Sequence, residues 1–215
     1  MLRLKNRLKL SLQVTCIAWL FCVGFLLGPV ESYAQPALAS LEQDRRTARV
    51  QATYLTHLVN FTYWKEEHLP KQGDSPKLVI LGDENRGFVE SLRFLVRQRA
   101  LKISDQLVEL HHFDNGQDAE AEEMLSGGCQ VVFILGSSSF SPAKVRSLTT
   151  HAVIFGEGRK FVTEMGGDVS FIVSRNRVKL VVSEKYFRRT SPKLSSKLAN
   201  LKSVVEIYPS RKNES

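Results

Sequence analysis

The side chains that could carry out catalysis are few and lie far apart in the sequence. Three serines, Ser137 to Ser139, directly follow an apolar run, where α/β proteins often present nucleophilic or ligand-binding groups. A serine nucleophile of the α/β-hydrolase type requires a Gly-x-Ser-x-Gly turn, and this stretch lacks it. We therefore interpret the triplet as the loop that leads into a helix. A hydrolase that uses one of these serines with a histidine is the least favoured hypothesis.

Metal and nucleotide sites are not favoured either. His111 and His112 are adjacent in an alternating run, and in a strand their side chains would point to opposite faces. Cys129 begins an apolar run, where a buried thiol behaves as a small hydrophobe. Residues 82–87 have only two of the three glycines of a dinucleotide-binding turn, and residues 156–160 lack the spacing of a P-loop. The sequence predicts a protein that is not an enzyme, with no cofactor and no metal ion.

Two stretches are candidates for binding another molecule. Residues 161–168 read Phe-Val-Thr-Glu-Met-Gly-Gly-Asp, and paired glycines permit either a tight turn or the close approach of another chain. A basic set near the C-terminus fits either a solvated helix face or an acidic partner: Lys185, Arg188, Arg189, Lys193 and Lys197. The predicted partner-binding residues are Phe161, Met165, Gly166, Gly167, Arg188 and Arg189.

These residues must be positioned by a fold in which helices and strands alternate. Stretches with helical spacing of apolar residues are 45–64, 88–96, 118–125 and 142–148. Runs with the continuous or alternating apolar pattern of strands are 77–82, 107–113, 130–136 and 152–155. This alternation predicts a mainly parallel central sheet that is flanked by helices on both faces.

The pattern changes toward the C-terminus. Residues 169–173 and 177–182 are β-rich and are joined by a short polar turn, which predicts an antiparallel hairpin that extends one edge of the sheet. We expect residues 183–201 to be helical again, with Pro192 starting a final amphipathic helix. The predicted fold class is therefore α/β, with a mainly parallel central sheet, flanking helices and a C-terminal antiparallel hairpin edge.

The first 34 residues have the organisation of a secretory signal, with four basic residues, an apolar run over 10–30 and small residues before position 35. A retained membrane anchor is the alternative, because about 20 apolar residues can span a bilayer. Both readings place the working domain in the periplasm. We predict a signal peptide over 1–34, a leader over 35–44, a single domain over 45–208 and a tail over 209–215.

Loss of the signal segment would change the charge and the cysteine count. It would leave 26 basic and 21 acidic residues, a net charge of +5, where the full chain has +8. This charge suits contact with anionic surfaces but does not predict nucleic-acid binding. Cys129 would be the remaining cysteine, so an intramolecular disulfide would be impossible.

Five short motifs occur in a fixed order along residues 45–201: Phe61-Thr-Tyr-Trp64, Leu78-Val-Ile-Leu-Gly82, Cys129-Gln-Val-Val-Phe-Ile134, Phe161-Val-Thr-Glu-Met-Gly-Gly167 and Leu194-Ser-Ser-Lys-Leu198. In this order the chain resembles the YfiR/HmsC-like periplasmic proteins. It departs from them at Lys65, where the family usually has proline, and at 182–183, where it usually has Ile-Asn. Val79 replaces a cysteine that often pairs with the equivalent of Cys129, so redox control through that bridge is not expected here.

The resemblance implies a regulatory function. A relative of this type holds the outer domain of an inner-membrane diguanylate cyclase inactive, and its release raises cyclic di-GMP and favours biofilm. The implied partner is therefore the periplasmic domain of such a cyclase, with an outer-membrane lipoprotein and a second copy of the chain as further candidates. The alternative is a small-ligand sensor, with a pocket at the carboxyl ends of the strands near Gly82, Gly136 and Ser137 to Ser139.

Overall fold

The computed structural model describes residues 34–71 and 73–208, so most of the predicted signal peptide and the predicted tail lie outside the described residues. The chain divides into two compact units, Met1–Glu42 and Gln43–Ser215, and the central sheet lies in the second. Helix α2 covers Ala34–Asn60, so it begins earlier than the predicted 45–64 and includes the predicted leader. It ends before strand β1 (Thr62–Tyr63). Within the described ranges, no helix has both the length and the apolar character needed to cross a bilayer.

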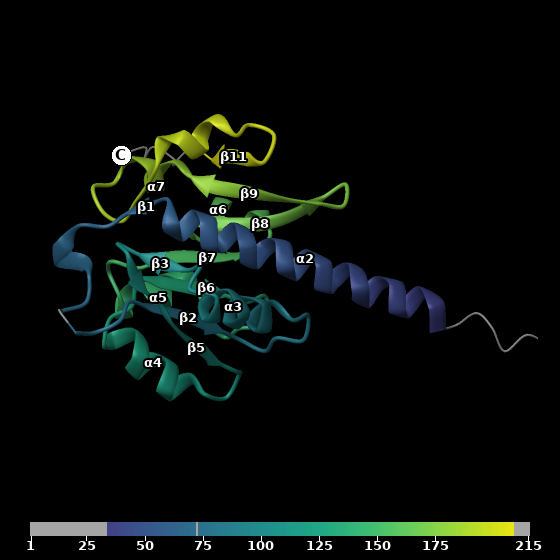
Figure 1. The fold of residues 1–215 in the computed structure, drawn as a ribbon, viewed down its shortest axis with the longest axis horizontal. Coiled ribbons are helices and arrows are strands. Elements are labelled where there is room, and N and C mark those ends of the chain that lie inside the picture. Colours follow the sequence, from purple (N-terminus) through teal and green to yellow (C-terminus); the bar gives the residue numbers. More distant parts are fainter. Residues whose placement is uncertain (1–33, 72, 209–215) are drawn as a thin grey trace, which may run out of the picture. The chain divides into compact units, whose positions relative to one another are not determined.

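A seven-stranded sheet organises the second unit, with the strand order β11-β9-β8-β7-β6-β2-β5 (Figure 1). The strands are β2 Lys77–Leu81, β5 Glu109–Phe113, β6 Val131–Ile134, β7 Val153–Glu157, β8 Val169–Ser174, β9 Arg177–Ser183 and β11 Val205–Tyr208. Neighbours from β5 to β8 are parallel, β8 and β9 form an antiparallel hairpin, and β11 is parallel to β9. The predicted α/β class, with its mainly parallel sheet and hairpin, is confirmed.

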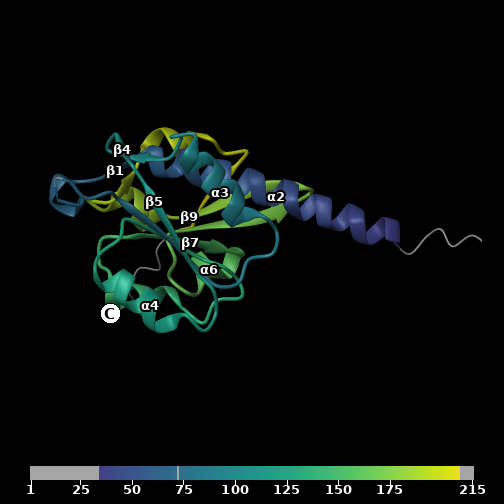
Figure 2. The ribbon, with the colours of Figure 1, turned by 60° about the horizontal axis from the view of Figure 1, so that its bottom comes forward.

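Alternating side chains of the buried strands build a separate core on each face of the sheet. In β2, Leu78 and Ile80 belong to one cluster, whereas Val79 and Leu81 belong to the other. Helices α2 and α3 lie over the first face, and α4 and α6 lie over the opposite face (Figure 2). The bounds of the shorter helices are α3 Phe88–Arg97, α4 Asp118–Ser126, α5 Pro142–Leu148 and α6 Arg159–Thr163. Helices on both faces are thereby confirmed.

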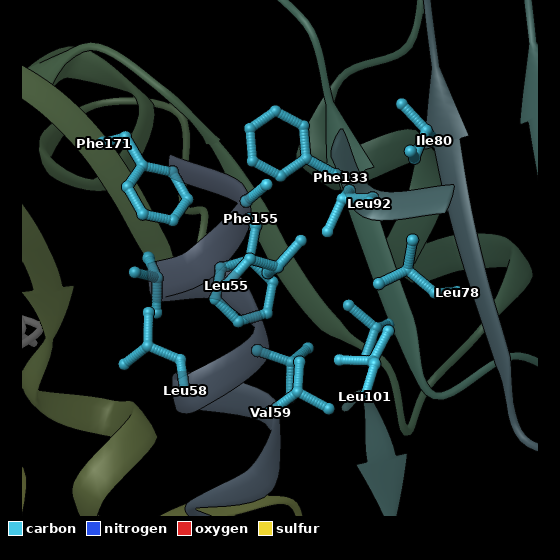
Figure 3. Packing of buried hydrophobic residues seen from close by; sticks show 14 of the residues in the cluster. Leu55, Leu58, Val59, Leu78, Ile80, Leu92, Leu101, Phe133, Phe155 and Phe171 are labelled. Atoms are coloured by element: carbon cyan, nitrogen blue, oxygen red, sulfur yellow. The ribbon is translucent and has the colours of Figure 1, made fainter. Parts of the chain in front are cut away.

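The core under α2 is built around aromatic rings (Figure 3). The ring of Phe133 in β6 lies 4.5 Å from that of Phe88 and 5.9 Å from that of Phe171, measured between centroids. Leu55 and Leu58 of α2 pack in the same cluster. Truncation of a buried ring of this kind costs about 3–5 kcal/mol of stability. Because the buried residues of α2 pack in the same cluster, this core holds the second half of α2 on the sheet.

The segment after the hairpin is less helical than the sequence predicts. Helix α7 spans only Glu184–Arg188, strand β10 (Lys193–Leu194) follows it, and residues Ser196–Asn200 form a 3-10 turn. The expected amphipathic helix from Pro192 is therefore wrong. Leu194 is fully buried and pairs with Thr62 of β1, which holds this stretch extended. Strand β11 and the short ribbon of β3 (Lys102–Ile103) and β4 (Gln106–Leu107) are further elements that the sequence pattern does not predict.

Candidate functional site

Asp168 lies immediately before β8 and is almost completely buried, with 3% of its surface exposed. Its Oδ2 accepts a hydrogen bond from the backbone N of Ile154 at 2.9 Å, and its Oδ1 accepts one from Nη2 of Arg146 at 2.7 Å. Arg189 forms a second ion pair with the same Oδ1. We call these three charged residues, Arg146, Asp168 and Arg189, the Asp168 cluster.

The Asp168 cluster joins elements that are distant in the sequence. Arg146 belongs to α5 and Arg189 follows α7, so one carboxylate connects both to the start of β8. The guanidinium of Arg189 also lies over the ring of Tyr186, 4.9 Å from its centroid. The hydroxyl of Tyr186 shares a 2.6 Å hydrogen bond with that of Thr62, and burial raises the pKa of this tyrosine far above its ordinary value. The C-terminal segment is therefore held to the start of β8 by Arg189 and to β1 by Tyr186.

Phe161 of α6 explains why the predicted glycine pair contains glycine. A Cβ atom on Gly167 would lie 2.1 Å from Cε1 of the Phe161 ring, and one on Gly156 would lie 2.3 Å from Cε2. Both positions therefore exclude any side chain while the ring stays in place. Gly166 has a φ of +82°, which residues other than glycine adopt only with strain. The close contacts of the glycine pair are thus with Phe161 of the same chain, which is what the tight-turn interpretation expects.

The structure brings together most of the predicted partner-binding residues, but in different roles. Phe161 and Gly167 touch each other, and the carbonyl of Gly166 accepts a 3.4 Å hydrogen bond from Arg146 of the cluster that contains Arg189. Met165, by contrast, is 49% exposed. The side chain of Arg188 is 76% exposed and pairs with Glu184 of the same helix.

Two members of the cluster were missed as functional residues by reasoning from the sequence. Asp168 directly follows the glycine pair and precedes a buried strand. A carboxylate in that position is expected to be buried, and a buried carboxylate needs a cationic or hydrogen-bonding partner. This was the signal that could have identified Asp168. Arg146 lies 22 positions earlier, on a different element, and nothing in its local pattern marks it.

The carboxyl ends of the parallel strands, where the alternative ligand pocket was expected, are occupied by hydrogen bonds between loops. Ser137 Oγ donates to the carbonyl of Asp83 at 2.9 Å, and Asn115 Nδ2 donates to Asp83 Oδ2 at 2.7 Å. A Cβ on Gly82 would lie 2.8 Å from Ser137 Oγ, so these loops approach closely. Ser138 Oγ accepts from the backbone, and Ser139 Oγ donates to Asp118. In the described part of the chain, no hydrogen bond joins these serines to a histidine.

The titratable groups at the opposite end of the strands form a separate polar region. His68 and His151 stack with ring centroids 3.7 Å apart, and His68 Nδ1 hydrogen-bonds to Ser191 Oγ at 2.8 Å. Burial, followed by the charge of His151, lowers the pKa of His68. Burial also raises the pKa of the nearby Cys129 thiol to about 12, so it is protonated at neutral pH. Among the described residues, no group of three or more His, Cys, Asp or Glu side chains is arranged to hold a metal ion.

The fold and the cluster define an α/β domain whose C-terminal segment is joined to the start of β8 by the ion pair between Arg189 and the buried carboxylate of Asp168. The chain belongs to the YfiR/HmsC-like family, because the model of that family matches residues 48–202. The comparison with curated proteins finds no match. The family is periplasmic and regulatory, and membership in it is consistent with regulation of diguanylate cyclases. The resemblance read from the five motifs is thus confirmed.

Proposed function

We propose that this chain is a periplasmic binding protein that represses an inner-membrane diguanylate cyclase, and so modulates cyclic di-GMP signalling and biofilm formation. The observation that carries the proposal is the family match, which spans residues 48–202 and so includes the sheet from β2 to β9. No chemical step is needed. A protein that binds the inactive conformation of the cyclase more tightly than the active one shifts the population by that difference in affinity.

The proposed contact surface lies around the exposed residues on either side of the Asp168 cluster. Met165 offers an exposed apolar side chain and Arg188 an exposed charge. Phe161, Gly167 and Arg189 support this surface from inside, by fixing the loop before β8 and the end of α7. The partner would therefore contact the first two residues directly and depend on the other three through the shape of the segment.

The test is a binding experiment with the periplasmic domain of a membrane diguanylate cyclase from the same cell. The double variant Met165→Ala/Arg188→Ala should weaken capture of that domain and raise cyclic di-GMP in the cell. Val173→Ala/Arg177→Ala is the matched control, because it removes an exposed apolar side chain and an arginine from the hairpin, and it should change neither readout. Failure of the unmodified protein to bind, together with unchanged cyclic di-GMP in a deletion strain, would overturn the proposal.

We also propose that residues 1–34 direct export and are then removed. Sequencing of the N-terminus of the protein purified from the cell envelope should begin at Gln35. A start at Met1 in the membrane fraction would instead support the retained anchor. In that case the domain would still face the periplasm, tethered to the membrane that holds its proposed target. A lipoprotein of the outer membrane and a second copy of the chain are further proposed partners, which cross-linking in cells would identify.

A further inference from the structure

A groove with a volume of about 560 Å³ lies between α2 and α3. Helix α2 contributes Arg45, Arg49 and Thr53, which follow one another at intervals of one turn, and Figure 2 shows α3 beside this helix. Helix α3 contributes Phe94 and Leu95. The volume falls within the range of about 300–1,000 Å³ that is typical of sites for small molecules.

The two α2 arginines that line the groove form no ion pair with any other described residue. No salt bridge found among residues 34–71 and 73–208 involves Arg45 or Arg49, and both are exposed. The other arginines of the groove have partners, because Arg86 pairs with Glu157 at 2.6 Å and Arg97 pairs at 3.2 Å with Glu90, the one carboxylate among the residues that line the groove. The groove therefore offers two guanidinium groups, one helical turn apart, whose charge no carboxylate of the described chain neutralises.

The same groove also has an apolar wall. Phe94 is 54% exposed, although α3 already buries Phe88, Val89 and Leu92 against the sheet. Leu95 continues this wall as a partly buried residue. A purely ionic ligand such as inorganic phosphate would leave the apolar wall in water, and a neutral apolar ligand would leave the two arginines without counter-ions. The groove matches a molecule that has both an anionic head and an apolar body.

We propose that the α2–α3 groove binds an amphipathic monoanion of the fatty-acid class. The carboxylate pairs with Arg45 and Arg49, and the alkyl chain lies along Phe94 and Leu95. Guanidinium groups suit this head because they donate two parallel hydrogen bonds to one carboxylate. The assignment does not depend on the proposed function, because it concerns binding to the isolated protein.

Calorimetric titration of the protein purified from the cell envelope, with dodecanoate below its micellar concentration, tests the proposal. We expect saturable binding with one site, weaker at high salt because exposed charges are screened. Dodecyl maltoside below its micellar concentration and acetate each lack one half of the ligand and should give no saturable heat. Equal binding of dodecyl maltoside and dodecanoate would overturn the proposal, because it would show that the arginines contribute nothing.

Three variants locate the site. Arg45→Ala/Arg49→Ala should weaken dodecanoate binding about tenfold or more, since charged hydrogen bonds of this kind are among the stronger contacts. Phe94→Ala should weaken it through loss of apolar contact. Arg46→Ala is the matched control, because this exposed arginine of α2 does not line the groove, and it should bind as the unmodified protein does. Equal loss in Arg46→Ala would overturn the assignment, as would arginine-dependent binding to anionic vesicles without binding of free dodecanoate.

Discussion

Two pairs of arginines in this protein have opposite surroundings. Arg146 and Arg189 share the carboxylate of Asp168, whose side chain is only 4% exposed. Arg45 and Arg49 line the α2–α3 groove, where no salt bridge among the described residues neutralises them. The first pair joins α5, through Arg146, and the C-terminal segment, through Arg189, to the start of β8. The second pair keeps its charge available to another molecule.

The difference shows that the type of residue does not by itself indicate a binding site. What decides the role of each arginine is whether the fold places a carboxylate within reach. A buried carboxylate needs its partners, because an unpaired buried charge is costly. Exposed arginines lose little by remaining in water. Substitution of Arg146 or Arg189 should therefore lower the free energy of unfolding much more than substitution of Arg45 or Arg49. Substitution of Arg45 and Arg49 should instead have the larger effect on the binding of an anionic ligand.

The largest expected effect is that of Asp168→Ala. This change leaves two partly buried guanidinium groups without their shared partner and leaves the backbone N of Ile154 without an acceptor. We expect a loss of about 3–5 kcal/mol in the free energy of unfolding, which is the usual cost of breaking a buried ion pair from one side. Denaturant unfolding measures it. A loss below about 1 kcal/mol would show that the cluster is effectively solvated, and the contrast between the two arginine pairs would fail.

The next effect in size concerns the glycine pair beside the cluster. Gly167→Ala places a methyl group within the ring of Phe161, and overpacking of this kind costs about 1–3 kcal/mol. The thermal midpoint should therefore fall. Gly127→Ala is the control, because its new Cβ would be in ordinary contact, at 3.5 Å, with Glu123 O, and the change should stay within about 0.5 kcal/mol.

A double variant separates this steric cause from a general effect on the loop. In the double variant Phe161→Ala/Gly167→Ala, the new methyl group meets no ring. The loss of stability in this variant should therefore be smaller than the sum of the losses in the two single variants. Strict additivity would show that Gly167 is required for some other reason. Loss of partner binding by Gly167→Ala at unchanged stability would favour the interface interpretation over the tight turn.

The sequence was sufficient to predict the elements that local pattern determines. The apolar runs at 77–82 and 130–136 became β2 and β6, and the hairpin became β8 and β9. The helix expected from Pro192 failed because its apolar residues serve a tertiary contact: Leu194 is buried opposite Thr62, more than a hundred residues away. Helical spacing over one or two turns cannot reveal such a contact.

The candidate site was predictable in its parts but not in its connections. The glycine pair and the basic residues were visible, yet Arg189 and Arg188 are neighbours with different environments. Only the position of Asp168 relative to α7 distinguishes them. The α2–α3 groove was missed for the same reason, because the spacing of Arg45 and Arg49 predicts a shared helix face but not the α3 wall beside it.

A smaller effect, confined to acidic pH, is expected from His68. Its pKa is lowered by burial and then by His151, so the unfolded chain takes up this proton at a higher pH than the folded one. Neutral His68 therefore costs no stability above about pH 6.5, the ordinary pKa of histidine. The free energy of unfolding should decrease as the pH falls from this value through the lower pKa of the folded protein. Unfolding midpoints measured across this range should show the loss, and His68→Gln should remove it.

The sign of this effect has an internal check in Glu67. Its carboxylate raises the pKa of His68, so Glu67→Gln should lower that pKa further and make the acid sensitivity steeper. A profile that is unchanged in His68→Gln would assign the acid sensitivity to groups other than His68.

The smallest expected effect on stability is that of Arg45→Ala/Arg49→Ala, and its sign is informative. The two arginines are one turn apart on α2, and like charges at this spacing destabilise a helix by about 0.2–0.5 kcal/mol. Alanine also has the highest helix propensity, so the variant should unfold at the same or a slightly higher denaturant concentration than the unmodified protein. Arg146→Ala should instead destabilise, because it removes one partner of a buried carboxylate. If both variants lost stability equally, the groove arginines would have a structural role. A loss of dodecanoate binding in Arg45→Ala/Arg49→Ala could then no longer be attributed to a missing contact with the ligand.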